Sequence, residues 1–343
     1  MKLRQVSVWS IGFLCSCLFI WMVSAVFSNG IAPVEWDDEL GVFVRSEGSV
    51  VRFRSEGWSD TRIGRHGLTV AGEAALKSSL PKFILWGDSF AEGLQIDDSL
   101  RAANLYNAMS DSMKAFTVAG GGLGVADYYF NIPRYENLAG NIDGHAILLV
   151  GMDDIMPEQH VACHSRFMAD PWRFEESACE PSDFAIRYAS FASTWRLEPI
   201  YTLYRFMKEH QFRFAPGHVG GNERNKTATL HKNLKQAWGF LVAGLKAQTS
   251  GFIVFVYVPP VPVLKDGRIV TLNPEEAQKE QFRKICKTHG LGFVDLSQPF
   301  FDLYAGHRLL SRGFFNSPPG GHLNEDGQRL IAEALYAYSK GKK

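Results

Sequence analysis

The sequence has little of several features that would assign a function directly. Its 36 basic and 36 acidic side chains cancel, so no charge excess favours binding to nucleic acid. The glycine run 120–124 has neither the Lys-Ser/Thr of a P-loop nor the spacing of a dinucleotide-binding fingerprint. No internal repeat and no low-complexity segment occurs. Because apolar residues make up 46% of the 343, the composition predicts a packed core and argues against general disorder.

Cysteines are few, and three of the five are expected to be inert. Cys15 and Cys17 lie inside an apolar amino-terminal segment, and Cys286 lies in a helical run. The remaining pair, Cys163 and Cys179, fits a disulfide in an oxidising compartment. Closing a loop of that size contributes roughly 3 kcal/mol.

A zinc site is the alternative for Cys163. His160 and His164 flank this cysteine, but the spacing matches no standard zinc finger. We therefore favour the disulfide and expect neither a metal nor an organic cofactor.

The amino terminus carries the one long uncharged run. Val6 to Phe27 is long enough to cross a bilayer, and the preceding Lys2 and Arg4 place the amino terminus in the cytoplasm. We interpret residues 1–30 as an uncleaved membrane anchor. The rival interpretation is a signal peptide cleaved after Val23-Ser-Ala25. Either interpretation predicts that the rest of the chain is exported.

The remainder predicts an α/β domain preceded by a short lead-in. Residues 31–80 contain alternating segments typical of short strands, and residues 81–343 hold strand–helix repeats. The five expected sheet strands are 83–86, 115–119, 146–150, 252–258 and 292–296. This rhythm predicts a three-layer α/β/α sandwich around a parallel, flavodoxin-like sheet of about five strands. Residues of about 157–250 interrupt it, and we interpret them as a helical insertion over the site.

Two stretches carry the candidate chemistry. Gly87-Asp88-Ser89-Phe90 follows the first sheet strand, at the sheet edge where open α/β folds bind ligands. Near the far end, His322-Leu-Asn324 precedes a helix for which Asn324 is a good N-cap. A serine hydroxyl needs such a base, because it is essentially never ionised at neutral pH. We therefore expect Ser89 and His322 to lie within hydrogen-bond reach.

Both stretches resemble motifs of the SGNH, or GDSL, hydrolase family. The resemblance implies that Ser89 is the nucleophile and that its backbone N–H is one oxyanion donor. It makes Gly122 a second donor, although Gly121 and Gly124 blur the register. Asp88, Asp154 and Asn324 are expected to have supporting roles.

The sequence departs from the family at two positions. Gly151-Met-Asp153-Asp154 stands where the family has Gly-x-Asn-Asp, so Asp153 replaces an oxyanion-hole asparagine. An ionised carboxylate cannot donate a hydrogen bond. Asp153 is therefore protonated, or has another task, or catalysis uses two backbone donors.

The second departure concerns the residue that orients the histidine. The family places Asp three residues before the His, and Pro319 stands there. The alternatives are a Ser–His dyad, a substitute such as Asp302 or Glu325, or a backbone carbonyl.

The resemblance implies ester chemistry, by a serine esterase or O-acyltransferase. Export together with an anchor predicts that the domain lies on the periplasmic side of a bacterial inner membrane. Its expected substrate is an acylated, most simply acetylated, cell-surface carbohydrate, with a membrane-bound O-acyltransferase as partner. The alternative is a catalytically inactive relative that binds glycan or scaffolds an export complex.

Overall fold

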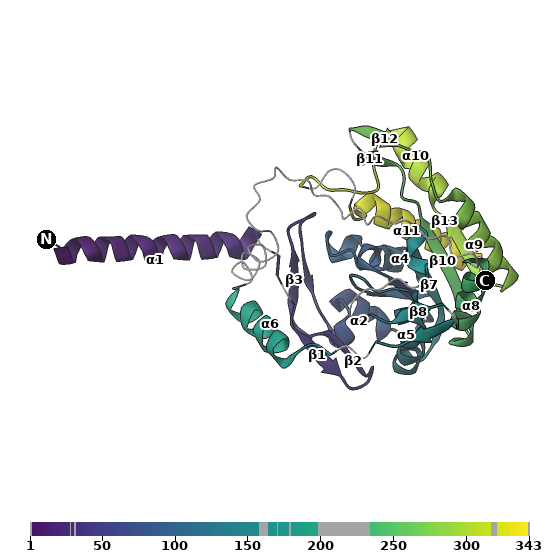
Figure 1. Cartoon of the computed structure of the whole chain (residues 1–343), viewed down its shortest axis with the longest axis horizontal. Helices are drawn as coiled ribbons and strands as arrows, with labels where there is room; N and C mark the ends of the chain where they lie inside the picture. The colour runs from purple at the N-terminus through teal and green to yellow at the C-terminus, as the bar shows by residue number, and fades with distance from the viewer. Residues whose placement is uncertain are drawn as a thin grey trace.

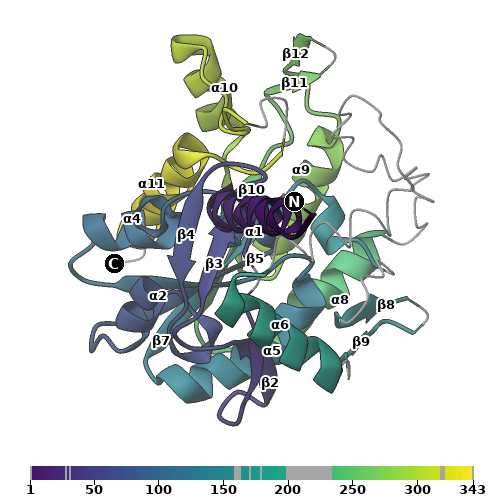
Figure 2. The same ribbon diagram turned by 90° about the vertical axis from the view of Figure 1, so that its left-hand side faces the viewer.

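A computed structural model describes residues 2–27, 29–30, 32–157, 164–169, 171–177, 180–197, 234–265, 267–316 and 321–341. Figure 1 shows one long helix projecting from an α/β domain, and Figure 2 views the molecule along that helix. The helix is α1 (Lys2–Phe27). Within it, Gln5–Val23 is long and apolar enough to span a bilayer, and none of this segment is buried by protein.

A five-stranded parallel sheet forms the middle layer of the domain. Its strands are β5 (Lys82–Gly87), β6 (Lys114–Ala119), β7 (Ile142–Val150), β10 (Phe252–Val258) and β13 (Gly292–Asp295). Their spatial order is β13-β10-β7-β5-β6, and every neighbouring pair is parallel. This is the predicted flavodoxin-like order, whose direction of winding reverses at β5 and β7. Loops that follow β5 and β7 therefore flank the position where such sheets bind ligands.

Alternation along the strands builds the two outer layers, because successive strand side chains point to opposite faces. On β5, Phe83 and Leu85 enter one core cluster, whereas Ile84 and Trp86 enter the other. The helices on the first side are α3 (Ser89–Glu92), α4 (Ala102–Met109), α10 (Ser297–His307) and α11 (Glu325–Lys340). Those on the other side are α2 (Val70–Leu76), α5 (Val125–Ala139), α8 (Leu234–Ala247) and α9 (Glu276–Thr288).

Part of the predicted insertion, residues 157–250, therefore belongs to an outer helical layer of the sandwich and is not an insertion. Helix α8 falls within residues 157–250, yet Trp238 and Leu241 on it are fully buried in the core. The other described parts of this region are a hairpin of β8 (Arg166–Met168) and β9 (Arg173–Glu175), and helix α6 (Asp183–Trp195).

The lead-in folds as two antiparallel hairpins beside the sheet domain. The first pairs β1 (Val34–Asp37) with β2 (Val42–Arg45), and the second pairs β3 (Val50–Phe53) with β4 (Ser59–Arg62). A third hairpin, β11 (Val263–Lys265) with β12 (Arg268–Val270), follows β10 where the sequence predicted one.

Candidate active site

Ser89 is held at the turn between β5 and α3. Asp88 is the N-cap of α3, and its Oδ1 accepts a hydrogen bond of 2.9 Å from the Phe90 N–H. A side chain at Gly87 would collide with Ala91, so the turn requires glycine there. Ser89 is the first residue of α3, where backbone N–H groups have no partner within the helix. The sequence Gly-Asp-Ser therefore presents both a hydroxyl and a backbone donor at the ligand-binding edge.

His322 reaches this hydroxyl from the loop before α11. Its Nε2 lies 2.8 Å from Oγ of Ser89, so the expectation that the two side chains meet is confirmed. Asn324 fixes the loop as predicted: its Oδ1 caps α11 by accepting from the Gly327 N–H at 3.2 Å, and its Nδ2 donates to the Leu310 carbonyl at 2.7 Å.

A carboxylate completes the arrangement, and it comes from the lead-in. Oε2 of Glu56, in the loop between β3 and β4, lies 2.6 Å from Nδ1 of His322. Oε1 of the same carboxylate accepts from the His322 backbone N–H, also at 2.6 Å. Of the alternatives for orienting the histidine, the structure shows a substitute carboxylate, but it is Glu56 and neither Asp302 nor Glu325. Asp302 instead accepts from Gln298 on α10, and Glu325 begins α11.

The backbone next to each residue makes the contact between Glu56 and His322 possible. Gly321 has φ +90°, and any side chain there would collide with the Glu56 carboxylate. On the other side, Gly57 has φ +70° and donates its N–H to Oδ1 of Asn316 at 2.8 Å. Nδ2 of Asn316 in turn donates to the carbonyls of Arg54 and Gly57. Asn316 thus ties the Glu56 loop to the segment that leads to His322.

The electrostatics of Glu56 suit a partner of an imidazolium. Partial burial raises the pKa of the Glu56 carboxyl, but the hydrogen bonds from the His322 ring and backbone lower it more, together with the charge of the ring. The net pKa is below its usual value, so the group is ionised at neutral pH. Sequence analysis missed Glu56 because its link to His322 spans 266 residues. The only available signals were the glycines at 57 and 321.

The expected oxyanion residues lie in the loops beside Ser89. Gly122 has φ +91°, which distinguishes it from Gly121 and Gly124 in the same run and identifies it as the residue that requires glycine. Asp153 follows β7 and opens a short 3-10 turn, Asp153–Ile155. It is half-buried, and Glu275 fixes the start of its loop by accepting from the Met152 N–H at 2.9 Å. An oxyanion role for these residues stays a prediction.

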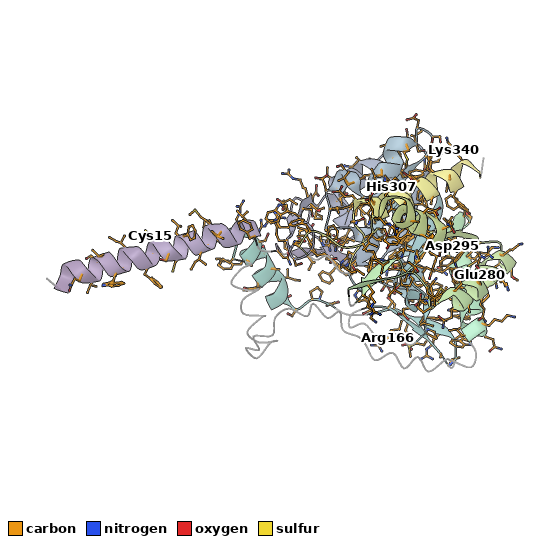
Figure 3. The ribbon with its side chains drawn as sticks, turned by 90° about the horizontal axis from the view of Figure 1, so that it is seen from above. Cys15, Arg166, Glu280, Asp295, His307 and Lys340 are labelled. Atoms are coloured by element: carbon orange, nitrogen blue, oxygen red, sulfur yellow. The ribbon has the colours of Figure 1, made fainter. Side chains whose placement is uncertain are left out.

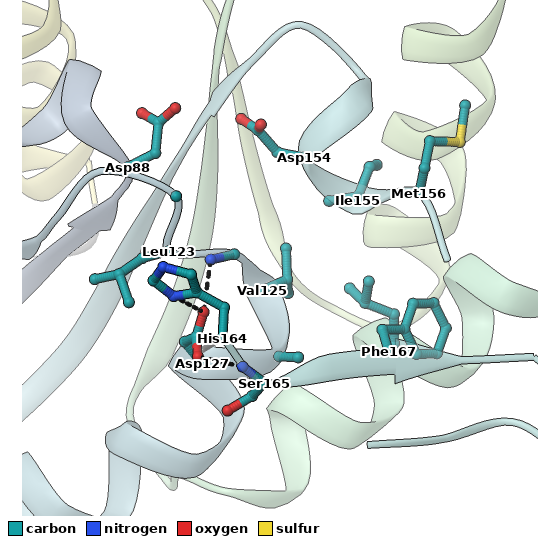
Figure 4. A pocket seen from close by; sticks show the side chains of 14 residues that line it. Asp88, Leu123, Val125, Asp127, Asp154, Ile155, Met156, His164, Ser165 and Phe167 are labelled. Carbon is teal, nitrogen blue, oxygen red and sulfur yellow. Dashed lines mark hydrogen bonds and ion pairs between the residues drawn. The ribbon is translucent and has the colours of Figure 1, made fainter. Parts of the chain in front are cut away.

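A cavity of about 260 Å³ lies next to the serine turn. Asp88 and Gly122 line it, with Asp154, Asp127 and His164 on the other walls. Figure 4 shows Asp88 and Asp154 on two separate loops, with His164 beside Asp127. Nδ1 of His164 lies 3.3 Å from Oδ2 of Asp127.

Two carboxyl groups at this cavity have raised pKa values. Burial raises the pKa of Asp88, and the nearby charges of His322 and Arg312 only partly offset that effect. Burial together with the charge of Asp88 raises the pKa of Asp154 to about 8. Oδ2 of Asp154 also accepts from the Val150 N–H at 2.9 Å, so this group supports the loop after β7. Supporting roles for Asp88 and Asp154 in catalysis stay predictions, and no hydrogen bond joins either side chain to His322 among the described contacts.

The cysteine predictions have different outcomes. Cys163, Cys179 and His160 lie outside the described residues, so the disulfide and the zinc alternative stay predictions. Pro319 lies outside them as well. Among the described residues, no group of three His, Cys, Asp or Glu side chains could hold a metal ion. Cys286 is fully buried, and this burial raises the pKa of its thiol, as expected for an inert cysteine.

Comparison with known proteins gives structural neighbours only. No family model and no curated protein matches the chain. A member of the lipolytic protein G-D-S-L family from Veillonella parvula aligns with a TM-score of 0.40 and 14% identity, covering 76% of this chain and 98% of its own. Phospholipase A1 from Streptomyces albidoflavus aligns with a TM-score of 0.40 and 13% identity, covering 76% and 100%. A two-domain esterase active on acetylated mannans aligns with a TM-score of 0.39 and 11% identity, covering 79% and 52%. Solved structures that resemble this chain thus include a lipolytic protein of the G-D-S-L family, a phospholipase and an esterase active on acetylated mannans.

Proposed function

We propose that the protein is a serine esterase or O-acyltransferase that works through an acyl-serine intermediate. The observation that carries the proposal is the chain of hydrogen bonds from Ser89 through His322 to Glu56. A serine, a histidine and a carboxylate in this sequence of contacts form a catalytic triad, which is recognised by geometry rather than by position in the chain.

Each residue has a defined step in such a reaction. Oγ of Ser89 attacks the acyl carbon, and its proton passes to Nε2 of His322. Nδ1–H of His322 then donates to Glu56, whose negative charge stabilises the imidazolium and fixes the tautomer. The tetrahedral intermediate expels the alcohol, which takes the proton from Nε2. Water, or a hydroxyl of an acceptor, then attacks the acyl-serine with the same base and releases Ser89.

The proposed substrate is an acyl ester of an exported carbohydrate, most simply an acetyl ester. Two features support this choice: the apolar α1, which suits a signal or an anchor, and the side chains of Asp88, Asp127 and Asp154 among the residues that line the cavity beside Ser89. In this proposal α1 is an uncleaved tether that holds the domain on the periplasmic face of the inner membrane. A membrane-bound O-acyltransferase is the proposed partner that adds or supplies the acyl group.

Covalent labelling tests the proposal directly. The full chain in detergent is treated with a fluorophosphonate, and mass spectrometry locates the adduct. We expect the label on Ser89, no label in Ser89→Ala, and release of acetate from acetylated polysaccharide by the wild type only. Absence of both labelling and acetate release in the wild type would replace the enzyme with the glycan-binding alternative.

A further inference from the structure

The loop that carries Glu56 also contacts the end of α1. Nε of Arg54 donates to the Val26 carbonyl at 2.9 Å, and the rings of Phe27 and Trp58 pack edge to face with centroids 5.5 Å apart. The Arg54 guanidinium lies over the Trp58 ring, 4.3 Å from its centroid. Glu56 stands between Arg54 and Trp58, so the triad is one loop away from the last turn of the apolar helix.

Helix α6 contacts α1 independently of that loop. Nε1 of Trp21 donates to the Trp195 carbonyl at 3.3 Å, and Trp21 belongs to the segment long enough to span a bilayer. Figures 1 and 3 both show α6 beside the end of α1 that joins the domain. The carboxyl end of α6 therefore lies beside the last residues of the membrane-spanning segment of α1.

Large aromatic side chains on these elements are exposed. The exposed fractions are 62% for Phe27, 45% for Trp58, 54% for Phe191 and 61% for Trp195. We call these four residues the aromatic face. Exposed Arg196 follows directly after Trp195. Aromatic side chains at the end of a membrane helix, with a cation beside them, are typical of the headgroup layer of a bilayer.

We propose that the aromatic face lies in the headgroup layer, so that Ser89 acts on acylated molecules held at the membrane surface. This inference rests on the proposed function, in which α1 stays attached as the tether. The lipid bilayer is what covers the aromatic face, because this face is continuous with α1. A bilayer around Gln5–Val23 therefore reaches the end of α6.

A larger groove adjoins the cavity beside the serine turn. It has a volume of about 680 Å³ and is lined by Val34 and Trp36 of β1, by Pro181 just before α6, and by Gly121 and Leu123. Strand β1 follows α1 in the chain, and Leu123 also lines the 260 Å³ cavity beside Asp88. The groove thus gives an acylated substrate room between β1, the start of α6 and the glycine loop next to Ser89.

Photo-cross-linking tests the placement of the aromatic face. The full chain is reconstituted into bilayers of zwitterionic and anionic phospholipid, with p-benzoylphenylalanine at Phe191 in one variant and at Phe301 in the control. Phe301 is 43% exposed and lies on α10, away from α1. We expect lipid adducts at 191 and none at 301. Adducts with protein at 191, no adduct at 191, or lipid adducts at both positions would overturn the proposal.

A kinetic comparison tests the consequence for substrates. Phe191→Ser with Trp195→Ser is compared with Phe301→Ser, using an acetylated glycolipid embedded in the same bilayers and a soluble aryl acetate. Loss of two interfacial anchors should raise KM for the embedded ester about tenfold or more, with kcat unchanged. The soluble ester should be hydrolysed equally by all variants. Equal KM values for the embedded ester would contradict surface delivery.

Failure of the proposed function can be distinguished from failure of the membrane placement. If wild type hydrolyses neither ester, the enzyme proposal falls whatever the cross-links show. If the mass of the purified chain reveals cleavage near Ala25, the tether itself is lost.

Discussion

Oε2 of Glu56 lies 2.6 Å from Nδ1 of His322, and Oε1 of the same carboxylate holds the backbone N–H of that histidine. One acidic side chain therefore fixes both the ring and the loop of the proposed base. We predict that Glu56→Gln lowers kcat by about 10³- to 10⁴-fold, because the amide neither stabilises the imidazolium nor selects the required tautomer. Rates of aryl acetate hydrolysis and of fluorophosphonate labelling measure the loss. Asp302→Asn is the control, and a comparable loss in that variant would argue against Glu56.

The same contact predicts a pH dependence of stability. The folded-state pKa of Glu56 is below its usual 4.5, despite partial burial, because His322 donates to it twice. Its contribution is therefore present above pH 4.5 and is lost as the pH falls through the lowered folded value. We expect Glu56→Gln to lower Tm at pH 7 and the difference from wild type to close in acid. A difference in Tm that is constant from pH 7 to pH 3 would contradict this linkage.

The raised pKa of Asp154 predicts that this group makes the fold less stable as the pH rises, the opposite of the effect of Glu56. Burial and the charge of Asp88 raise the folded pKa of Asp154 to about 8, so ionisation of this group in the unfolded chain costs stability above pH 3.8. Asparagine keeps the oxygen that accepts from Val150 but cannot ionise. Asp154→Asn should therefore leave Tm unchanged near pH 3.5 and raise it progressively toward pH 8. Equal Tm values for both chains at pH 8 would mean that Asp154 is not held neutral.

Asp153 allows a gain of activity to be predicted. If this residue only weakens the oxyanion hole, Asp153→Asn restores a donor and lowers the barrier by up to about 2.7–4 kcal/mol. A fall in kcat would instead assign Asp153 a positive task, such as holding a substrate hydroxyl. The measurement is kcat for aryl acetates, with Ser89→Ala as the inactive control. If wild type is inactive and Asp153→Asn does not restore activity, the glycan-binding alternative gains support.

The disulfide remains a prediction for the region before α6. Peptide mapping without reductant should find Cys163 joined to Cys179, which requires Cα atoms within about 7 Å. Cys163→Ser should then lower the free energy of unfolding by roughly 3 kcal/mol. Free thiols at both positions, or stoichiometric zinc in the purified protein, would favour the metal alternative.

Much of the fold could be predicted because its signals are local. All five sheet strands are apolar runs that end at glycine, proline or polar residues, and the structure contains each of them. The capping role of Asn324 and the meeting of Ser89 with His322 also follow from short motifs placed at strand and helix ends.

Other parts of the fold and of the site depend on tertiary packing, which the spacing of residues in the sequence does not reveal. Glu56 reaches His322 only because the β3–β4 hairpin packs beside the sheet domain and Asn316 ties the two loops together. The sequence pattern places the residues of α8 in the insertion, although a parallel connection from β7 to β10 usually contains a helix that packs against the sheet. Its fully buried Trp238 supplies that helix, and the rule for parallel crossovers would have found it.

Glu56, Ser89 and His322, the residues of the proposed triad, are far apart in the sequence, and this separation has a consequence for biogenesis. Glu56 and Ser89 precede His322 by 266 and 233 residues. In the proposed topology the amino terminus stays in the cytoplasm and the segment after α1 is translocated first, so Ser89 is exported long before His322, the proposed base. Nascent and partly translocated chains have an inert hydroxyl at position 89. Under the proposed mechanism, ester cleavage begins only when α11 has folded against α4, so the unfinished chain attacks neither lipids nor glycans near the export channel.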